Sequence, residues 1–195
     1  MNVRLKTTPL WGLLLLAMPA CSPVEEEASL DDTATIESTT DTLAGVMGDV
    51  EDSATIRQAV EDAGLASLMD GSGIYTLLAP QDAAFDKLGD EGERLLSEDQ
   101  RPLLVSVLRE HILPGHVTPE AIEVALDQQR GEVEMTTLGG GIVTFSRGED
   151  GAIVVSDPGG SSARIAGTAI AASNGTVIPI DAVLVPAGAG SPTAQ

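Results

Sequence analysis

The segment Tyr75-Thr-Leu-Leu-Ala-Pro-Gln-Asp-Ala-Ala-Phe85 decides the fold, because it joins a buried strand to a helix through a fixed turn. The run from Ile74 to Ala79 is short and apolar and ends at Pro80, which predicts a buried strand. Asp82 is expected to cap the following helix by accepting backbone N–H bonds. A catalytic Asp82 is the alternative, but capping accounts for the residue in full. The helix is then expected to pack four apolar residues inward: Ala83, Ala84, Phe85 and Leu88.

Apolar residues at helical spacing precede this strand and predict two amphipathic helices. Ser53 or Asp52 is expected near the start of the second helix, and Gly64 is expected to interrupt it. The first helix holds Leu43, Val46, Met47 and Val50, and the second holds Ile56, Val60, Leu65, Leu68 and Met69.

A second segment, Leu108-Arg-Glu-His-Ile-Leu-Pro-Gly115, ends the next predicted helix at Pro114-Gly115. With Asp99 as the N-cap of this helix, Pro102 falls in the first turn, where backbone donors have no intrahelical partner and proline is tolerated. A further short helix is predicted from Pro119 to Leu126. The apolar face of the helix before Pro114 contains Leu104, Val107, Leu108 and His111.

Strand patterns dominate from Gly131 onward, with turns at 139–141 and 148–151. A third segment, Ala172-Ser-Asn-Gly-Thr-Val-Ile-Pro-Ile-Asp-Ala-Val-Leu-Val-Pro186, contains Asn174-Gly175, the strongest two-residue hairpin signal. This hairpin is expected to join a strand from Arg164 to Ala172 with one from Val177 to Val185. Because the helices come first and the strands later, the fold class is predicted to be α+β.

The order and spacing of these three segments resemble the fasciclin domain, over roughly Thr40 to Ala187. The resemblance implies a β-wedge of two small sheets flanked by helices, in a module linked to adhesion and protein contact. Two positions depart from the family pattern. Gln81-Asp82 stands where the family usually has Thr-Asn, and Glu110-His111 stands where it commonly has a Tyr-His pair associated with adhesion. We therefore do not transfer the adhesive contact through that pair.

Residues 1–20 are typical of an export signal, with Arg4 and Lys6 before an apolar run from Leu10 to Ala17. A permanent membrane helix is the competing interpretation, but it needs about 20 apolar residues. Cys21 follows Ala20 directly and is the only cysteine, so no intramolecular disulfide forms. Its position resembles a bacterial lipobox, which implies a diacylated Cys21.

Ordinary signal cleavage that leaves a free thiol at Cys21 is the alternative to lipidation. In a lipoprotein, Ser22 after the cysteine favours sorting to the outer membrane or its periplasmic face. Residues 21–40 are acidic and poor in large apolar residues, which predicts a flexible tether. The fasciclin-like domain is assigned to residues 41–187, and residues 188–195 are expected to form a disordered tail.

The formal net charge of −20 argues against nucleic acid and anionic lipid headgroups as partners of the folded domain. His111 and His116 are the only histidines, and no ligand spacing around them predicts a metal site. Asn174-Gly175-Thr176 also fits a glycosylation sequon, although a hairpin explains the same residues. We predict no catalytic, cofactor or metal residues, and six structural positions: Asp82, Phe85, His111, Asn174, Gly175 and Asp181, the last through hydrogen bonds of its carboxylate.

The leading hypothesis is a cell-envelope lipoprotein, held in a membrane by its N-terminal lipid, that presents one fasciclin-like domain. The domain would be a non-enzymatic adhesion or contact module for a protein or an envelope or matrix partner. The alternative is a lipoprotein that binds a small molecule or envelope polymer in a cleft between the helices and the wedge. An enzyme is the third hypothesis. It would need a cluster of titratable residues with perturbed pKa values, and none can be assembled from the sequence.

Overall fold

The structure, a computed structural model, describes residues 40–129 and 131–185. The predicted export signal, Cys21 and nearly all of the tether and the tail lie outside these residues. The helices are α1 (Leu43–Val46), α2 (Ala54–Asp62), α3 (Ala66–Met69), α4 (Asp82–Asp86), α5 (Asp90–Leu95), the short 3₁₀ helix η1 (Glu98–Gln100), α6 (Arg101–Glu110) and α7 (Pro119–Gln129). The strands are β1 (Tyr75–Pro80), β2 (Ile112–Pro114), β3 (Glu132–Thr136), β4 (Ile142–Arg147), β5 (Ile153–Ser156), β6 (Ser162–Arg164), β7 (Ile170–Ala172) and β8 (Gly175–Ile180).

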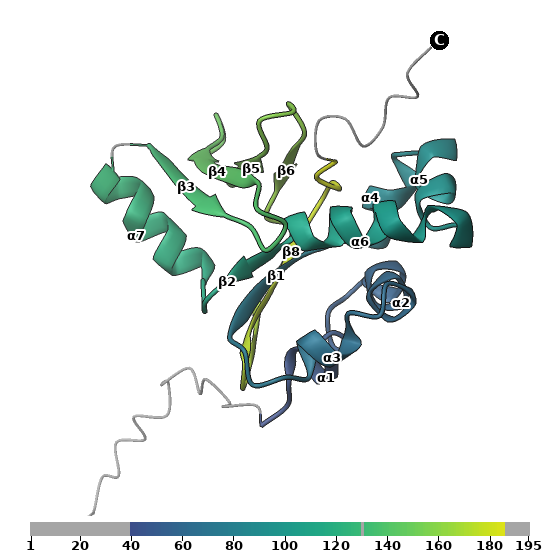
Figure 1. The fold of residues 1–195 in the computed structure, drawn as a ribbon. Coiled ribbons are helices and arrows are strands. Elements are labelled where there is room, and N and C mark those ends of the chain that lie inside the picture. The colour runs from purple at the N-terminus through teal and green to yellow at the C-terminus, as the bar shows by residue number, and fades with distance from the viewer. Residues whose placement is uncertain (1–39, 130, 186–195) are drawn as a thin grey trace, which may run out of the picture. The chain divides into compact units, whose positions relative to one another are not determined.

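The strands form two four-stranded sheets, with helices packed against both (Figure 1). One sheet has the order β2-β1-β8-β7, in which β1 and β8 run parallel and the outer strands are antiparallel to them. The other sheet, β3-β4-β5-β6, is antiparallel throughout. A single bridge between Ile165 and Ile180 connects the end of the second sheet to β8. The predicted α+β class with two small sheets and flanking helices is confirmed.

The burial of each strand follows from its neighbours. The central strand β8 is buried along its whole length, and β1 is buried after its first residue, as expected for strands covered on both faces. In β4 and β5, buried residues alternate with more exposed ones, because only one face of that sheet packs inward. α7 covers part of this sheet by packing against β3 and β4.

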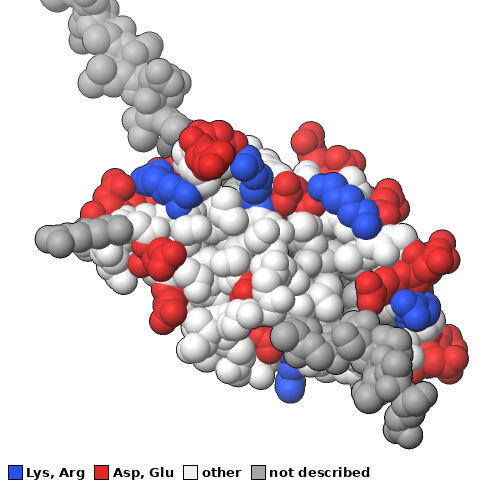
Figure 2. Space-filling view, turned by 90° about the horizontal axis from the view of Figure 1, so that it is seen from above, with Lys and Arg blue, Asp and Glu red and all other residues white. Residues whose placement is uncertain are grey.

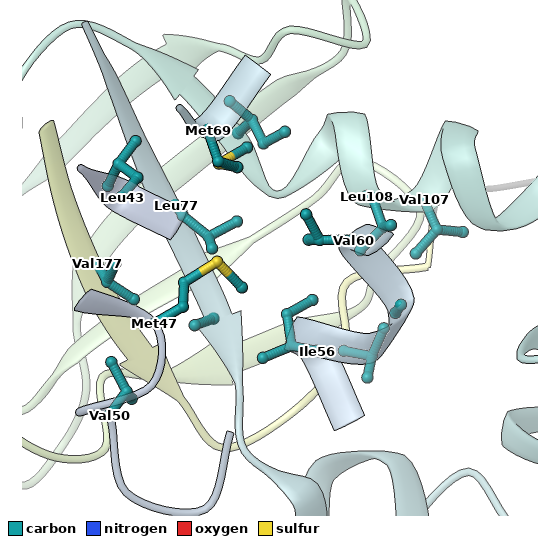
Figure 3. Close-up of a cluster of buried hydrophobic side chains, with 14 of the residues drawn as sticks. Leu43, Met47, Val50, Ile56, Val60, Met69, Leu77, Val107, Leu108 and Val177 are labelled. Atoms are coloured by element: carbon teal, nitrogen blue, oxygen red, sulfur yellow. The ribbon is translucent and has the colours of Figure 1, made fainter. Parts of the chain in front are cut away.

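The core is aliphatic and consists of two clusters. The first lies between the N-terminal helices, α6 and the first sheet, and Figure 3 shows its side chains pointing toward one another. The second lies around Phe145, between α7 and both sheets. Labelled members of the first cluster are Leu43, Met47, Val50, Ile56, Val60, Met69, Leu77, Val107, Leu108 and Val177.

Several predicted boundaries are wrong, each for a tertiary reason. The expected strand from Arg164 to Ala172 is split between two sheets, because Ile165 turns away to bridge Ile180. β8 ends at Ile180 instead of Val185, because the backbone of Asp181 pairs with Arg164. Ile112–Pro114, expected at the end of a helix, is strand β2 and pairs with β1.

The start of α6 also differs from the prediction. Pro102 lies in the first turn, as predicted, but Gln100 and not Asp99 is the N-cap. Asp99 belongs to η1, which turns the chain before the α-helix begins. Within α4, Ala84 and Phe85 are buried as expected, whereas Ala83 faces solvent.

Asp82 does not cap its own helix, contrary to prediction. It is the first residue of α4, and its Oδ1 accepts a hydrogen bond of 2.7 Å from the backbone N–H of Thr55 at the start of α2. Ser53, the N-cap residue of α2, makes no side-chain cap bond to the backbone N–H groups at the start of that helix. Its hydroxyl instead donates to the carbonyl groups of Met47 and Val50. Burial alone raises the pKa of Asp82, but hydrogen bonds from Thr55 and Ala54 outweigh burial and leave that pKa below its usual value.

Replacing Asp82 by alanine is expected to lower the free energy of unfolding by about 1 kcal/mol at pH 7, the typical cost of losing an N-terminal cap. The lowered pKa of Asp82 means that its contribution is present above its unfolded-state value of 3.8 and declines at more acidic pH. Urea unfolding measures both effects. The matched control is Asp86→Ala at the exposed end of the same helix. Equal losses in the two variants would contradict the cap.

Candidate functional site

His111 lies at the C-terminal end of α6 and is buried, with 1% of its surface exposed. Its Nε2 lies 3.0 Å from the backbone N–H of Leu184, which can only donate, so Nε2 is the acceptor. The proton therefore lies on Nδ1, which donates to the carbonyl of Val107 at 2.8 Å. The carbonyl of His111 accepts from the N–H of Leu78 in β1. This one residue thus connects α6, β1 and the segment that follows β8.

Burial lowers the pKa of His111 to about 4, against the opposing effects of the Val107 hydrogen bond and the charge of Asp157. The imidazole is consequently neutral at pH 7, and both of its nitrogens are occupied by backbone groups. A ring in this state has no free nitrogen for a metal or for proton transfer. Among residues 40–129 and 131–185, no group of three or more His, Cys, Asp or Glu side chains is placed to hold a metal ion.

We expect the free energy of unfolding to fall as the pH is lowered from 6.5 toward 4. The unfolded imidazole protonates near 6.5 and the folded one near 4, so in this window the unfolded state binds the extra proton. The slope contributed by His111 is at most about 1.4 kcal/mol per pH unit. Urea unfolding between pH 4 and 8 measures how the free energy of unfolding changes with pH. The control is His116→Gln at an exposed position, which is expected to show the same slope as the wild-type protein. A His111→Gln variant with an unchanged slope would contradict this origin.

Glu110, the neighbour of His111, is half-buried and fits against the glycine-rich turn between β3 and β4. Its Oε2 accepts a 2.5 Å hydrogen bond from the hydroxyl of Thr137. A Cβ atom at Gly139 or Gly141 would overlap the Glu110 carboxylate. Backbone hydrogen bonds from Leu138 to Ile112 and from Gly139 to Arg109 hold this turn against the end of α6 and β2. The glycines therefore leave the space that the carboxylate occupies.

A cavity of about 190 Å³ lies beside Glu110. A second carboxylate, that of Asp157 in the β5–β6 turn, lines it as well. Oδ1 of Asp157 accepts from the N–H of Ser161 at 3.2 Å, whereas Oδ2 is shielded from solvent and has no hydrogen-bond partner among the described residues. The remaining lining residues are Gly141, Ile142, Val143, Pro158, Gly159 and Leu184. We call this space the Glu110–Asp157 cavity.

Asn174 is buried and connects the β7–β8 turn to the start of α1 and to the end of α3. Its Oδ1 accepts from the N–H of Leu43 at 2.7 Å, and its Nδ2 donates to the carbonyls of Met69 and Gly71 at 2.8 Å each. A glycan on Nδ2 would break these last two bonds, so the folded structure does not support the sequon interpretation. The predicted hairpin is present, but its loop is Ser173-Asn174, one residue earlier than expected.

Gly175 is the first residue of β8, and it packs directly against the carbonyl of Tyr75 in the parallel strand β1. This close approach explains why the loop begins one residue earlier. Asp181, just after β8, is half-buried, and its carboxylate accepts a 2.7 Å hydrogen bond from the N–H of Arg164. Lys87 donates to the carbonyl of Asp181 at 2.8 Å.

The six predicted structural positions do not form one site. Asp82 begins α4 and its carboxylate contacts the start of α2, Asn174 and Gly175 lie near α1 and β1, and Asp181 joins β6 to the end of β8. None of the six lines the Glu110–Asp157 cavity, whereas Glu110, noted in the sequence as a departure from the family pattern, does. Asp157 was missed, because the sequence Asp157-Pro-Gly-Gly160 signals only a turn.

Acidic side chains lie mostly around the rim of the face shown in Figure 2, and its middle is largely uncharged. Two ion pairs occur among the described residues, Arg147–Asp127 and Arg164–Asp150, and both are solvent-exposed. Exposed pairs of this kind add little stability. None of the helices in residues 40–129 and 131–185 has the length and apolar character needed to span a bilayer.

Comparison with known proteins gives a consistent assignment. A family model for the fasciclin domain matches residues 51–186. Protein sll1483 of Synechocystis sp. is 30% identical over 175 residues, which cover 88% of this chain and 89% of that protein. Transforming growth factor-beta-induced protein ig-h3 of Sus scrofa is 33% identical over 133 residues, 68% of this chain but 17% of that protein.

Among solved structures, a domain pair from the insect cell adhesion molecule fasciclin I superposes with a TM-score of 0.67. The match covers 78% of this chain and 53% of that chain. At 16% sequence identity, this likeness concerns the fold alone.

Proposed function

Because the chain belongs to the fasciclin domain family, we propose that it is an exported lipoprotein whose single domain is a non-enzymatic contact module of the cell envelope. The observation that carries the proposal is the family match over residues 51–186. The adhesion role of the insect fold neighbour supports this class of function. The partner is a protein, or a component of the envelope or matrix, recognised by the folded domain.

The use of the interior polar groups supports a non-enzymatic role. Catalytic groups are accessible and have pKa values matched to proton transfer. Both ring nitrogens of His111 are instead hydrogen-bonded to backbone groups. The carboxylates of Asp82 and Asp181 accept hydrogen bonds from backbone N–H groups. These hydrogen bonds hold separate elements of the domain together.

The membrane anchor in this proposal is a diacylated Cys21. Acyl chains bind a bilayer with about 0.8 kcal/mol per buried methylene group, so two chains give stable attachment. The acidic segment 21–40 then acts as a tether that gives the domain reach from the outer membrane or its periplasmic face.

Metabolic labelling with an alkyne analogue of palmitate tests the anchor. The wild-type chain is expected to be labelled and to sediment with membranes, and Cys21→Ala is expected to lose both properties. Ser22→Ala changes the residue next to Cys21 and is the matched control, which is expected to be labelled like the wild-type chain. Equal labelling of wild type and Cys21→Ala would exclude lipidation at this cysteine.

Attachment of a deletion strain to surfaces and to purified envelope material tests the contact role. Loss of attachment that the wild-type gene restores, and Cys21→Ala does not, is the expected result. Unchanged attachment across all surfaces tested would count against a contact module.

The second candidate function is binding of a small molecule or envelope polymer. The Glu110–Asp157 cavity favours it, because this space lies between the end of α6 and the antiparallel sheet. Saturation-transfer NMR against envelope sugars and amino acids distinguishes it from the contact role, since a contact module shows no saturable small ligand of that kind.

A further inference from the structure

We infer that Asn174 is a deamidation site that the folded domain protects, so that unfolding exposes it and the modified chain cannot regain the original stability. The inference concerns the lifetime of the domain and is independent of its partner. It follows from the sequence of the β7–β8 turn, from the hydrogen bonds that hold this turn, and from the packing of Gly175.

The sequence Asn174-Gly175 is chemically labile when the backbone around it is free. Asparagine is a thermolabile residue, and a following glycine has no Cβ to hinder its backbone nitrogen. The nitrogen of Gly175 attacks Cγ of Asn174, a new N–Cγ bond forms, and Nδ2 leaves as ammonia with the proton from that nitrogen. Water then opens the cyclic imide at either carbonyl and leaves aspartate or isoaspartate in the chain. The net reaction consumes water and releases ammonia.

In the folded domain, the side chain of Asn174 is held in one orientation. Its Oδ1 accepts from the N–H of Leu43, and its Nδ2, the leaving group, donates to the carbonyls of Met69 and Gly71. Only 7% of the residue is exposed, so water has little access to it. These hydrogen bonds oppose both the rotation that the attack requires and the departure of Nδ2.

The backbone of the turn is held as well. The carbonyl of Asn174 accepts from the N–H of Tyr75 at 3.1 Å, which fixes the planar peptide group that contains the nitrogen of Gly175. Gly175 is buried and pairs with Ala172 in β7 and with Tyr75 in β1. The nitrogen can therefore move onto Cγ only after the turn has left the sheet.

The same packing explains why a labile sequence occupies this turn. A Cβ at position 175 would overlap the carbonyl oxygen of Tyr75, so the fold requires glycine there. The fold also requires an amide at position 174, because one buried side chain supplies an acceptor for Leu43 and a donor for Met69. Neither residue of the labile pair can be exchanged without a loss of stability.

The products of deamidation cannot restore these contacts. Aspartate at position 174 has no N–H donor and would place a carboxylate beside the carbonyl oxygens of Met69 and Gly71. Isoaspartate, in addition, inserts a methylene group into the backbone of the two-residue turn. The side chains of Leu43 and Met69, both in the first core cluster (Figure 3), then lie on helices that are no longer tied to the turn. Chemical change in the unfolded state thus makes unfolding irreversible.

The first test compares the full-length protein in buffer and in guanidinium chloride at pH 8, with deamidation of Asn174 measured by peptide mass spectrometry. Asn2 is the only other asparagine and lies in a separate peptide. We expect deamidation to be at least about a hundredfold slower in buffer, because about one molecule in a thousand or fewer is unfolded at equilibrium. Rates in the two solvents that agree to within about tenfold would overturn the inference.

A destabilising variant distinguishes unfolding from local motion of the turn. Asp82→Ala acts at the opposite end of the β1–β8 ladder and leaves the contacts of Asn174 intact. It is expected to deamidate about fivefold faster than the wild type in buffer and at the same rate in guanidinium chloride. Asp86→Ala is the matched control with the wild-type rate in both solvents. Equal rates of Asp82→Ala and the wild type in buffer would show that the turn opens without unfolding, contrary to the inference.

Refolding tests the loss of stability. Wild-type protein is held in guanidinium chloride at pH 8 for increasing times and then diluted to a concentration just below the unfolding midpoint of intact protein. We expect the folded fraction, isolated by gel filtration, to contain intact Asn174 and to shrink as deamidation proceeds. Protein held unfolded for the same times at pH 5, where the attacking nitrogen is less often deprotonated, is the control and is expected to refold. Deamidated chains that refold as well as intact ones would overturn the inference.

Discussion

Gly175→Ala is expected to lower the free energy of unfolding by about 4 kcal/mol or more, or to prevent folding, because it forces an atom into the backbone of a neighbouring strand. The new Cβ would overlap the carbonyl oxygen of Tyr75. Gly175 and Tyr75 form the first pair of the parallel β1–β8 ladder, which runs through the centre of the first sheet. Moving either strand to relieve the overlap would disturb the remaining pairs.

Urea unfolding of the purified protein measures this loss, with Gly48→Ala as the control. A Cβ at Gly48 would make only an ordinary contact with the carbonyl of Gly45, so a small change is expected there. Similar stabilities of the two variants would show that β1 and β8 do not approach as closely as described.

Asn174→Ala is expected to lower the free energy of unfolding by about 3–5 kcal/mol, because it removes the partners of two buried backbone groups and one partly buried backbone group. These are the N–H of Leu43 and the carbonyls of Met69 and Gly71. Each unsatisfied buried group costs about 1–3 kcal/mol, and part of this is recovered by local relaxation or water. The first core cluster is expected to loosen around α1 and α3.

Two further variants separate the hydrogen bonds of Asn174 from its place in the loop. Asn174→Asp keeps the acceptor for Leu43 but loses both donors, so it is expected to be about as unstable as the alanine variant. Ser173→Ala changes the exposed loop neighbour and is expected to be nearly neutral. Equal stabilities of Asn174→Ala and Ser173→Ala would contradict the role assigned to Asn174.

Local pattern was sufficient for the elements whose ends are set by nearby residues. The buried strand ending at Pro80 and the helix with Pro102 in its first turn are both present. The pattern failed where a distant segment decides the outcome. Asp82 caps α2 because Ser53 is engaged elsewhere, and the strand expected after Arg164 divides because Ile165 pairs with Ile180.

The candidate site was only partly visible in the sequence. Glu110 could be noted because it departs from a family pattern at a position next to His111. Asp157 lies 47 residues further along in a turn, and no periodicity relates it to Glu110. Their shared cavity exists because the β3–β4 and β5–β6 turns both approach the end of α6, which depends on the packing of the complete domain.

If the buried polar side chains serve the scaffold and leave recognition to the surface, His111 must be neutral and fully engaged. The most direct measurement is ¹⁵N NMR of the His111 ring between pH 8 and pH 5. We expect a protonated Nδ1 and an unprotonated Nε2 throughout, in agreement with the bonds to Val107 and Leu184 and a pKa of about 4. A ring that titrates near pH 6.5, or that carries its proton on Nε2, would contradict the scaffold role. It would favour a catalytic or metal-binding role for His111.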